Sequence, residues 1–449
     1  MIEKIVKRDG RVVPFDREKI TFAVLRAAVA VGGRDRTIAE GITEQVVAIL
    51  EDRYSDGRSG GSSATDYPTV EEIQDIVEKV LIENGHARTA KAYIVYRYEH
   101  TLKRAGRESL TYSSENVPYR KLWETLSWAV DHNCHTLAGL REYVSSGRYP
   151  ELVEVSEEFY ANEVSNAADA LKERLDEVRI MIIAGPSSSG KTTTTIKLSE
   201  AIPDRRLVPI NVDHYFFDLD THPRDSRGDY DFETPQALDM GLLNDHLSRL
   251  VAGESVDIPF YNFKSGNREG TSGTLELGST DILLIDSLHG LFPQMTEAVP
   301  DEKKFKLYIE TLAQIKDDEG RFLRWTDIRM LRRMVRDMQF RNYPPEQTLR
   351  HWYLVRRAEL RYIVSRLRLA EVVVNSFMPC ELPIMKGRLE HMFGAFVEHL
   401  QDDPEKTDAL DRAIRVRKLL ASVPAVEGEE DIGPRSLLRE FIGGSEYSY

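Results

Sequence analysis

The chain has 449 residues, of which 41% are hydrophobic and 30% charged, and its formal net charge is −14. That length exceeds what one hydrophobic core supports, so two or three domains are expected. The acidic balance argues against a nucleic-acid partner, which would need an excess of Lys and Arg. No apolar run approaches the roughly 18 residues of a membrane span, so no membrane partner is expected either.

Cysteine content and the N-terminus indicate a cellular compartment. Cys134 and Cys380 are the only cysteines, which excludes a disulfide framework. The segment MIEKIVKRDGR lacks the apolar core of a signal peptide. We therefore expect a cytoplasmic protein.

Residues 1–104 are predicted to form one mostly helical domain with a β-hairpin. The segment KIVKRDGRVVPF indicates the hairpin, with Asp9-Gly10 at a tight turn. Asp16 stands where a helix cap belongs, and Thr69 with Glu72 forms a capping box for a later helix. Further helices are expected at about 37–51 and 87–103, and a Gly/Ser-rich mobile loop at 53–68.

The rest of the chain changes to alternating strands and helices. Residues 105–150 are expected to be a helical connector, with helices near 121–130 and 136–146, followed by a long helix at about 156–177. Four short, apolar, unalternated segments indicate buried parallel strands: 179–184, 207–212, 281–285 and 371–375. The pattern predicts an α/β, doubly wound parallel-sheet domain over 151–400. Residues 401–449 are expected to be a C-terminal extension, and its last forty residues are expected to be partly disordered.

A phosphate-binding motif follows the first of these strands. GPSSSGKT at 185–192 matches G-x-x-x-x-G-K-[ST] between a predicted strand and a predicted helix. In such a loop the backbone amides and the helix N-terminus bind the phosphates of a nucleotide, Lys191 contacts the β- and γ-phosphates, and Thr192 ligates Mg²⁺. We expect ATP to be bound by Gly185, Ser187, Ser188, Ser189, Gly190, Lys191, Thr192 and Thr193.

Two strand-end carboxylates are candidates for the remaining chemistry. Asp213 ends VPINVD and Asp286 ends DILLID. Either could hold Mg²⁺ or act as a base on a substrate hydroxyl, and either could instead cap a helix. His289 lies three residues beyond Asp286 and could reach the same site.

Arginine is concentrated between residues 321 and 368. This stretch has thirteen Arg, no Lys and four acidic residues. In TDIRMLRRMVRDMQFR the apolar residues share one helical face. The remaining surface of this helix includes Arg332, Arg333 and Arg336. A lid that places guanidinium groups over the phosphates is the favoured interpretation. The alternative is a solvated face with pairs such as Arg333–Asp337.

Residues 150–390 resemble the uridine kinase/phosphoribulokinase family, especially its bacterial nucleoside-kinase-like branch. The segments that carry the resemblance include NVDHYFFD, GDYDFETPQALD, IPFYNFKSGNR and VVVNSFMPCELPIMK. It implies that Asp213 is the catalytic Asp, which leaves the strand-end carboxylate Asp286 to join Thr192 as the predicted metal ligand. It also implies an acceptor pocket formed by Tyr215, Tyr230, Asp231, Tyr261, Phe263 and Arg268.

One position departs from the family pattern. Uridine kinases have a His two residues before the Arg that corresponds to Arg268, and this chain has Gly266 there. The acceptor is therefore predicted to be a nucleoside, with a non-nucleoside polyol or sugar as an alternative. A second alternative is a nucleotide-sensing regulatory protein without catalytic activity.

Residues 1–104 resemble a different family, the ATP-cone domain of ribonucleotide reductases and their transcriptional regulator. The motif VKRDGRVVPFDREKI carries the resemblance, with TVEEIQDIVEKVL and TAKAYIVYRYEH behind it. It implies allosteric binding of ATP or dATP by Val6, Lys7, Arg8, Lys19 and Lys91. It also implies assembly into a homo-oligomer.

A weaker signal lies in the connector. His132, Cys134 and His135 could begin a zinc site, but no second cluster of ligands accompanies them. Helix packing is the favoured role for these residues. The sequence thus predicts an ATP- and Mg²⁺-dependent phosphotransferase with an alcohol-group acceptor and an N-terminal nucleotide sensor.

Overall fold

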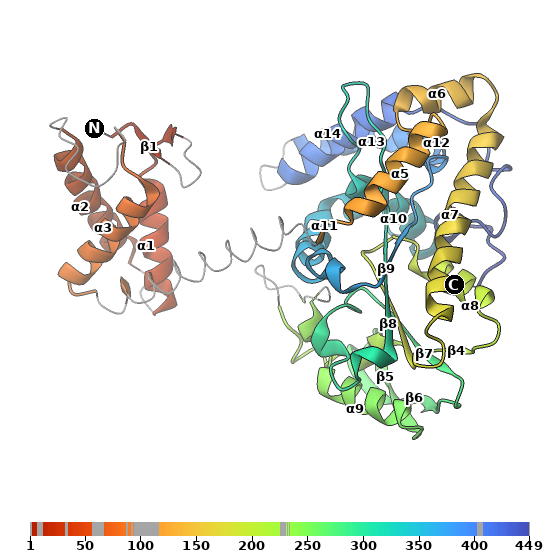
Figure 1. Cartoon of the computed structure of the whole chain (residues 1–449). Helices are drawn as coiled ribbons and strands as arrows, with labels where there is room; N and C mark the ends of the chain where they lie inside the picture. Colours follow the sequence, from red (N-terminus) through yellow and green to blue (C-terminus); the bar gives the residue numbers. More distant parts are fainter. Residues whose placement is uncertain are drawn as a thin grey trace. The chain divides into compact units, whose positions relative to one another are not determined.

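The chain divides into two compact units in a computed structural model, Met1–Ser109 and Leu110–Tyr449 (Figure 1). The structure describes residues 2–6, 12–31, 35–55, 67–86, 89–90, 93, 116–224, 230, 232, 234–401 and 407–448. Within those residues, no helix combines the length and the apolar character needed to cross a membrane.

Unit 1 contains a hairpin and a helical core. Strands β1 (Lys4–Val6) and β2 (Val12–Pro14) pair antiparallel, and helices α1 (Glu18–Ala30), α2 (Arg36–Ser55) and α3 (Val70–Glu83) follow. Their apolar faces meet in a core that includes Val24, Val46, Leu50, Val77 and Leu81. The hairpin and these helices confirm the mostly helical prediction.

The predicted caps in unit 1 are present. The Thr69 hydroxyl accepts a hydrogen bond from the Glu72 amide at 3.2 Å, and Asp16 accepts one from the Glu18 amide at 3.1 Å. The Glu72 side chain does not complete the capping box, because it bonds Arg53 and Tyr54 of α2 instead. The turn at Asp9-Gly10 and most of the loop at 53–68 lie outside the described residues.

Unit 2 is built on a five-stranded parallel sheet in the order β4-β7-β3-β8-β9. Its strands are β3 (Ile180–Ala184), β4 (Leu207–Pro209), β7 (Ile282–Ser287), β8 (Lys304–Glu310) and β9 (Val372–Asn375). Side chains alternate between two hydrophobic clusters, as the two-residue repeat of a strand requires. Met181 and Ile183 enter the cluster that contains the helices α7 (Tyr149–Lys172) and α8 (Lys191–Ala201). Ile180 and Ile182 enter the cluster that contains α9 (Met240–Val251).

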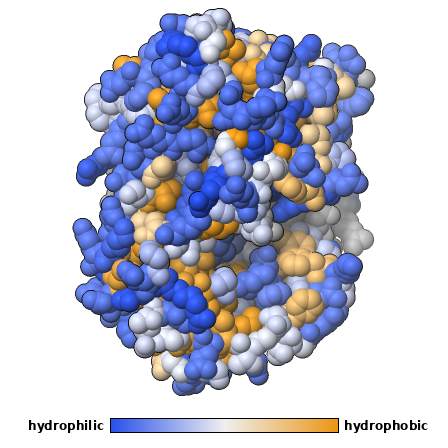
Figure 2. Space-filling view, turned by 90° about the vertical axis from the view of Figure 1, so that its right-hand side faces the viewer, coloured by the Kyte–Doolittle hydropathy of each residue, from blue (hydrophilic) through white to orange (hydrophobic). Residues whose placement is uncertain are grey.

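Helices and a second hairpin complete unit 2. The antiparallel strands β5 (Val256–Asn262) and β6 (Asn267–Leu275) form the hairpin. The α-helices are α5 (Tyr119–Asp131), α6 (Leu137–Ser145), α7 (Tyr149–Lys172), α8 (Lys191–Ala201), α9 (Met240–Val251), α10 (Trp325–Arg341), α11 (Pro345–Ala358), α12 (Glu381–Leu389), α13 (Phe393–Gln401), α14 (Thr407–Ser422) and α15 (Arg439–Ile442). The face seen in Figure 2 is mostly hydrophilic, with hydrophobic residues in small groups.

The four predicted strands are present, but the sequence analysis missed a fifth. Strand β8 occupies a central place between β3 and β9, yet its sequence KFKLYIE is not uniformly apolar. Lys304 and Lys306 both pair with Asp301, so charged side chains are accommodated at the start of a buried strand. The parallel-sheet fold is confirmed, with one more strand than predicted.

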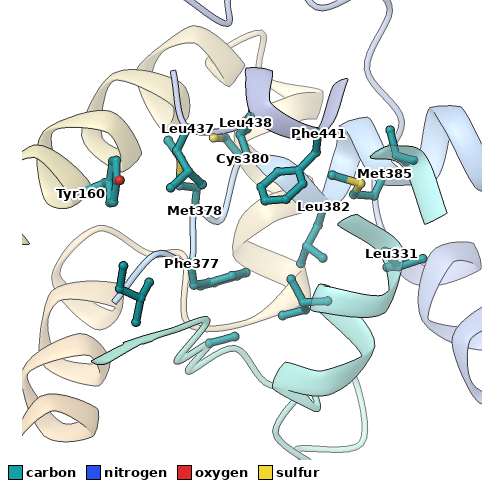
Figure 3. Packing of buried hydrophobic residues seen from close by; sticks show 14 of the residues in the cluster. Tyr160, Leu331, Phe377, Met378, Cys380, Leu382, Met385, Leu437, Leu438 and Phe441 are labelled. Atoms are coloured by element: carbon teal, nitrogen blue, oxygen red, sulfur yellow. The ribbon is translucent and has the colours of Figure 1, made fainter. Parts of the chain in front are cut away.

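The C-terminal segment, defined here as residues 429–448, contradicts the expectation of partial disorder. Leu437, Leu438 and Phe441 are fully buried. Figure 3 shows them packed with Tyr160 of α7 and with Leu382 and Met385 of α12. The apolar residues of this segment are too few to give a clear helical repeat, but their burial against unit 2 orders the chain.

Candidate active site

The phosphate loop connects β3 to α8 at the carboxyl edge of the sheet. Gly185 lies so close to β8 that a Cβ atom there would be 2.4 Å from the Ile309 carbonyl oxygen. Ser188 has a positive φ of 60° and is buried, a strained conformation of the kind found at functional loops. The Lys191 ammonium donates to the carbonyls of Gly185 at 3.1 Å and Pro186 at 3.3 Å.

Three arginines of α10 face this loop around a single carboxylate. Arg336 donates two hydrogen bonds to Asp337, at 3.0 and 2.9 Å, and Arg333 donates one at 3.3 Å. Arg341 pairs with the same carboxylate at 3.4 Å. The three guanidinium groups therefore keep an excess of positive charge. Arg333 also donates to the Ser187 hydroxyl at 3.3 Å.

These groups line a cavity of about 270 Å³ over the phosphate loop. Its walls are formed by residues 187–192, Leu288, Glu440 and the three arginines Arg333, Arg336 and Arg341. Burial lowers the pKa of Arg336, and Asp337 partly opposes that shift. Backbone amides, a lysine and several guanidinium groups around one small cavity suit a polyphosphate.

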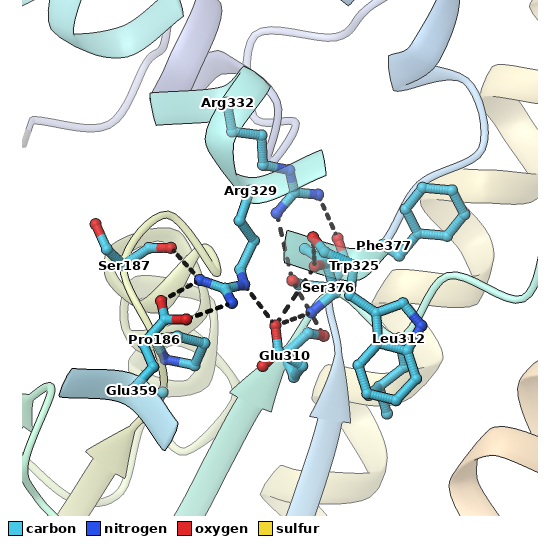
Figure 4. Close-up of polar contacts among 12 residues, drawn as sticks. Pro186, Ser187, Glu310, Leu312, Trp325, Arg329, Arg332, Glu359, Ser376 and Phe377 are labelled. Atoms are coloured by element: carbon cyan, nitrogen blue, oxygen red, sulfur yellow. Dashed lines mark hydrogen bonds and ion pairs between the residues drawn. The ribbon is translucent and has the colours of Figure 1, made fainter. Parts of the chain in front are cut away.

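Two other arginines of α10 are enclosed in ion pairs (Figure 4). The Arg329 guanidinium is fully buried between Glu310 at 2.7 Å and Glu359 at 2.5 Å, and it donates to the Ser187 carbonyl at 3.1 Å. Arg332 is also fully buried and donates to Glu381 at 2.6 and 2.8 Å and to the Ser376 carbonyl at 2.7 Å. This placement contradicts the expectation that Arg332 faces the phosphates, because its charge is neutralised inside the core.

The lid interpretation of α10 also needs correction. Nine residues of the helix, among them Ile328, Leu331 and Val335, are buried. The helix is therefore part of the core of unit 2, and only its later arginines reach the phosphate cavity. The predicted alternative pair Arg333–Asp337 is present as well.

Asp213 and Asp286 lie at the carboxyl edge of the sheet beside the phosphate loop. Asp286 is in β7, which pairs with β3 and β4, and Asp213 is in the short 3₁₀ helix (Val212–Tyr215) that follows β4. Both reach solvent, although protein surrounds them on most sides. Ligands of open α/β sheets bind at this edge.

The charged groups of this edge influence one another. Removal from water raises the pKa of Asp286; Lys191 opposes the shift, and the charges of Glu440 and Asp213 add to it. Removal from water also raises the pKa of Asp213, with His214 opposing it. Burial lowers the pKa of Lys191, against the attraction of Asp286 and Glu440. These groups therefore share one site.

The arrangement also fits a magnesium ion. Within the described residues the Asp286 carboxylate makes no hydrogen bond or ion pair, so its oxygens are available to a cation. Mg²⁺ binds through one or two carboxylates with substrate phosphates and water completing its coordination. Asp286, near the end of β7, and Thr192, in the first turn of α8, supply such oxygen ligands.

Glu440 is a member of the site that sequence analysis did not identify. Its carboxylate accepts hydrogen bonds from the Thr193 amide at 3.0 Å and from the Thr193 hydroxyl at 2.7 Å. The two residues are 247 positions apart, so no local pattern connects them. Among the residues predicted to bind ATP, Thr193 is thus the one whose amide and hydroxyl both donate to a carboxylate of the chain.

The predicted acceptor residues have different positions. Tyr215 is fully buried and its hydroxyl bonds His246 at 2.9 Å, so it belongs to the core and does not face an acceptor. Tyr261 is buried and its hydroxyl has no hydrogen-bond partner among the described residues, whereas Phe263 is 62% exposed. The two rings lie 5.0 Å apart, and Phe216 contacts both.

Arg268 braces this region. It donates to the Phe216 carbonyl at 3.0 Å and pairs with Asp239 at 3.1 Å, which ties the hairpin of β5 and β6 to the segment after Asp213. Tyr230 lies under the Arg224 guanidinium at 4.0 Å. Asp231 lies outside the described residues.

The weaker candidates have packing contacts. His289 is buried with its ring 5.9 Å from that of Tyr362. His132 bonds the Trp128 carbonyl at 2.8 Å and stacks on that ring, and Cys134 is fully buried. Among the described residues there is no group of three or more potential metal ligands from His, Cys, Asp and Glu.

Of the predicted allosteric residues, two are described. Val6 is in β1, and its amide bonds the Pro68 carbonyl at 3.0 Å. Lys19 is in the first turn of α1, highly exposed, and 3.5 Å from Asp16. Lys7, Arg8 and Lys91 lie outside the described residues.

Comparisons with known proteins match both units. Residues 3–102 match the ATP cone domain, and residues 180–382 match the phosphoribulokinase / uridine kinase family. A uridine kinase of Deinococcus deserti is 28% identical over 43% of this chain and 84% of its own length. One of Chloroflexus aurantiacus is 28% identical over 47% and 94%. Uridine-cytidine kinase B of Dictyostelium discoideum is 26% identical over 43% and 73%.

Each match lies within one of the two structural units. The family match at 180–382 begins at β3 and ends in α12, so it contains the phosphate loop, both strand-end carboxylates and the arginines of α10. The match at 3–102 covers the hairpin and the helices of unit 1. The chain therefore carries an ATP-cone domain followed by a kinase domain of the phosphoribulokinase/uridine kinase family.

Proposed function

We propose that this chain transfers the γ-phosphoryl group of ATP to a hydroxyl group of a nucleoside. The observation that carries the proposal is the cavity lined by the phosphate loop, Lys191 and three arginines, together with the exposed carboxylates Asp213 and Asp286 at the same edge of the sheet. The loop, the lysine and the arginines suit the binding of a polyphosphate, and a carboxylate suits the activation of a hydroxyl acceptor.

On the donor side the chain would bind and neutralise the phosphates. Residues 185–193 would bind ATP through the loop amides, and Lys191, Arg333 and Arg336 would stabilise the charge that spreads over the transferred group. Thr192 and Asp286 would hold Mg²⁺, which supplies further charge neutralisation when bound. The excess of guanidinium groups over Asp337 supports this role.

On the acceptor side Asp213 would orient and deprotonate the hydroxyl. Its pKa is raised, which brings a carboxylate closer to the range in which general bases are effective. Phe263, with the buried rings of Tyr261 and Phe216 behind it, would form an apolar wall for the acceptor. Tyr230 and Asp231 would complete the pocket.

A nucleoside is the favoured acceptor because the relatives are named uridine kinases and because aromatic rings suit a flat base. A polyol or sugar is the second candidate, and Gly266 favours it. Gly266 has φ 73°, and a Cβ there would lie 2.9 Å from Leu219. The turn therefore has no place for a side chain that could read a base.

The two domains would divide the work between sensing and catalysis. In this proposal residues 1–104 bind ATP or dATP through Val6, Lys7, Arg8, Lys19 and Lys91, and residues 151–400 catalyse the transfer. The match of residues 3–102 to the ATP cone domain supports it. Allosteric control then requires that the effector bind two states of the protein with unequal affinity.

A substrate panel tests the catalytic proposal. Purified protein is incubated with Mg-ATP and individual nucleosides and sugars, and ADP release and product mass are followed. We expect one nucleoside to be phosphorylated, and Asp213→Asn to lower kcat by roughly 10²–10⁴-fold. Asp204→Asn, at an exposed turn before β4, is the matched control. Phosphorylation of a polyol alone would replace the nucleoside, and unchanged activity of Asp213→Asn would remove its catalytic role.

A charge reversal tests the regulatory proposal in the full chain. We expect Lys19→Glu to alter the response of velocity to ATP or dATP, because an anionic side chain repels the phosphates. Lys79→Glu, another exposed lysine, on α3, serves as the control. Identical response curves for the two variants and the unsubstituted chain would contradict a role for Lys19.

A further inference from the structure

A carboxylate of the C-terminal segment occupies donors of the phosphate loop. Glu440 is buried and accepts hydrogen bonds from both the amide and the hydroxyl of Thr193. Glu440 lies beyond residues 180–382, the part of the chain that matches the kinase family. Its contact with the loop is therefore a property of this chain that the family match does not include.

The donors that Glu440 occupies are those that an anion would use. Helix α8 begins at Lys191, so the Thr193 amide is in its first turn and has no acceptor within the helix. Amides in this position bind phosphate groups because they point out of the helix and carry its positive end. A carboxylate bonded there accepts from a donor of the kind that binds phosphate oxygens.

The segment is built onto the loop, so this contact is not that of a loose surface residue. Leu437 packs against Gly190 so closely that a Cβ there would be 2.6 Å from the Leu437 side chain. Phe441 lies under the Arg332 guanidinium at 5.0 Å, and Arg435 pairs with Glu200 of α8. Figure 3 shows Leu437, Leu438 and Phe441 held among residues of several helices.

The charge of Glu440 also acts on the cavity. Glu440 lines the cavity with Lys191 and the arginines of α10, and its charge adds to the raised pKa of Asp286. An incoming triphosphate is strongly negative, so it meets repulsion from this carboxylate in a partly dehydrated site. The triphosphate also competes with the Glu440 carboxylate for the amide and hydroxyl of Thr193.

We propose that Glu440 sets the affinity of the donor site by competing with the triphosphate of ATP for Thr193. The carboxylate satisfies the amide and the hydroxyl of Thr193, and the triphosphate of ATP would use these donors only when the carboxylate leaves them. The inference rests on the proposed function, because it assumes that residues 185–193 bind ATP. It makes the C-terminal segment a restraint on donor binding.

Calorimetric titration of ATP into the full chain tests the inference. The donor-site component is identified as the part of the binding heat that Lys191→Ala removes, which separates it from binding to unit 1. We expect Glu440→Gln, which keeps the shape and removes the charge, to lower the donor-site Kd by about tenfold, because bonds to a charged acceptor are stronger than neutral ones. Glu440→Ala is expected to act in the same direction.

The matched control is Glu446→Gln, an exposed residue of the same segment, which is expected to leave Kd unchanged. If Glu440 only supported the loop, both Glu440 variants would bind ATP more weakly than the unsubstituted chain. An equal or higher Kd for Glu440→Gln would overturn the inference and leave the donor site standing. Absence of any component sensitive to Lys191→Ala would overturn the donor proposal itself.

Discussion

Helix α10 carries two sets of arginines with different environments, one buried in ion pairs and one lining the phosphate cavity. Arg329 and Arg332 are fully buried, and each has at least one carboxylate of its own. Arg333, Arg336 and Arg341 share Asp337 and line the phosphate cavity. The first set is neutralised within the core, whereas the second keeps an excess of positive charge.

The difference teaches that the balance of partners decides what an arginine does here. Burying a charge is tolerable when it is paired and fully hydrogen-bonded, and Arg332 meets that condition through Glu381 and Ser376. An excess of guanidinium over carboxylate groups is tolerable only where water or an anionic ligand reaches it. The first set should therefore affect folding, and the second should affect phosphate chemistry.

The largest expected effect is on stability, from Arg332→Ala. Leaving Glu381 buried without its partner should destabilise unit 2 by about 3–5 kcal/mol. All four tryptophans, Trp123, Trp128, Trp325 and Trp352, are in unit 2, so urea denaturation followed by tryptophan fluorescence reports on that unit. Replacing both partners, with Arg332→Met and Glu381→Leu, is expected to restore most of the stability. A single variant as stable as the unsubstituted chain would break the distinction between the two sets.

The next effect is on catalysis, from Arg336→Ala. Loss of a charged donor at the transferred phosphoryl group should lower kcat by roughly 10²–10³-fold. The unfolding midpoint is expected to change little, because Arg333 and Arg341 still pair with Asp337. Steady-state kinetics beside the same denaturation assay measures both quantities. A large loss of stability with unchanged kcat would place Arg336 in the first set.

The pH profile sharpens the comparison from the carboxylate side. Arginines of both sets stay charged at any physiological pH, so the acid limb must come from groups such as Asp213. Removal from water raises its pKa, so the ionised base is lost at a higher pH than for an ordinary Asp. We expect kcat/KM to fall about tenfold per pH unit below that pKa. Asp213→Asn should abolish this limb, and its persistence would assign the limb elsewhere.

The smallest effect is expected from Arg341→Ala. Its side chain is 59% exposed and lies 3.4 Å from Asp337, and such solvent-screened pairs contribute little. A rise of no more than about threefold in KM for ATP is expected, with kcat unchanged. An effect as large as that of Arg336→Ala would show that the contributions of Arg333, Arg336 and Arg341 do not decrease with the exposure of their side chains.

Local patterns predicted the parts of the molecule that depend on neighbouring residues. The phosphate loop is a contiguous motif between a buried strand and a helix, and both flanking elements are present. Helices α5 and α6 match their predicted ranges within a few residues for the same reason. Strand β8 was missed because Lys304 and Lys306 interrupt its apolar run, although its central place in the sheet buries Lys304 and half-buries Lys306.

Long-range partners decided what the sequence could not predict. Arg332 looks like its neighbour Arg333, and only Glu381, 49 residues away, marks it as a core residue. Tyr215 was predicted to line the acceptor pocket, but its hydroxyl is hydrogen-bonded to His246, 31 residues away. Spacing along one helix or strand carries no information about such partners.

The distance in sequence between Thr193 and Glu440 has a consequence for protein synthesis. The ribosome adds roughly 5–20 residues per second, so Glu440 is made on the order of 10–50 seconds after Thr193. Glu440 is 247 positions after Thr193, and the residues between them must be made before Leu437 and Glu440 can reach the loop. During that interval the helix N-terminus at Lys191 lacks its internal anion, and a nascent chain whose sheet has formed presents those amides to the nucleotides of the surrounding solution.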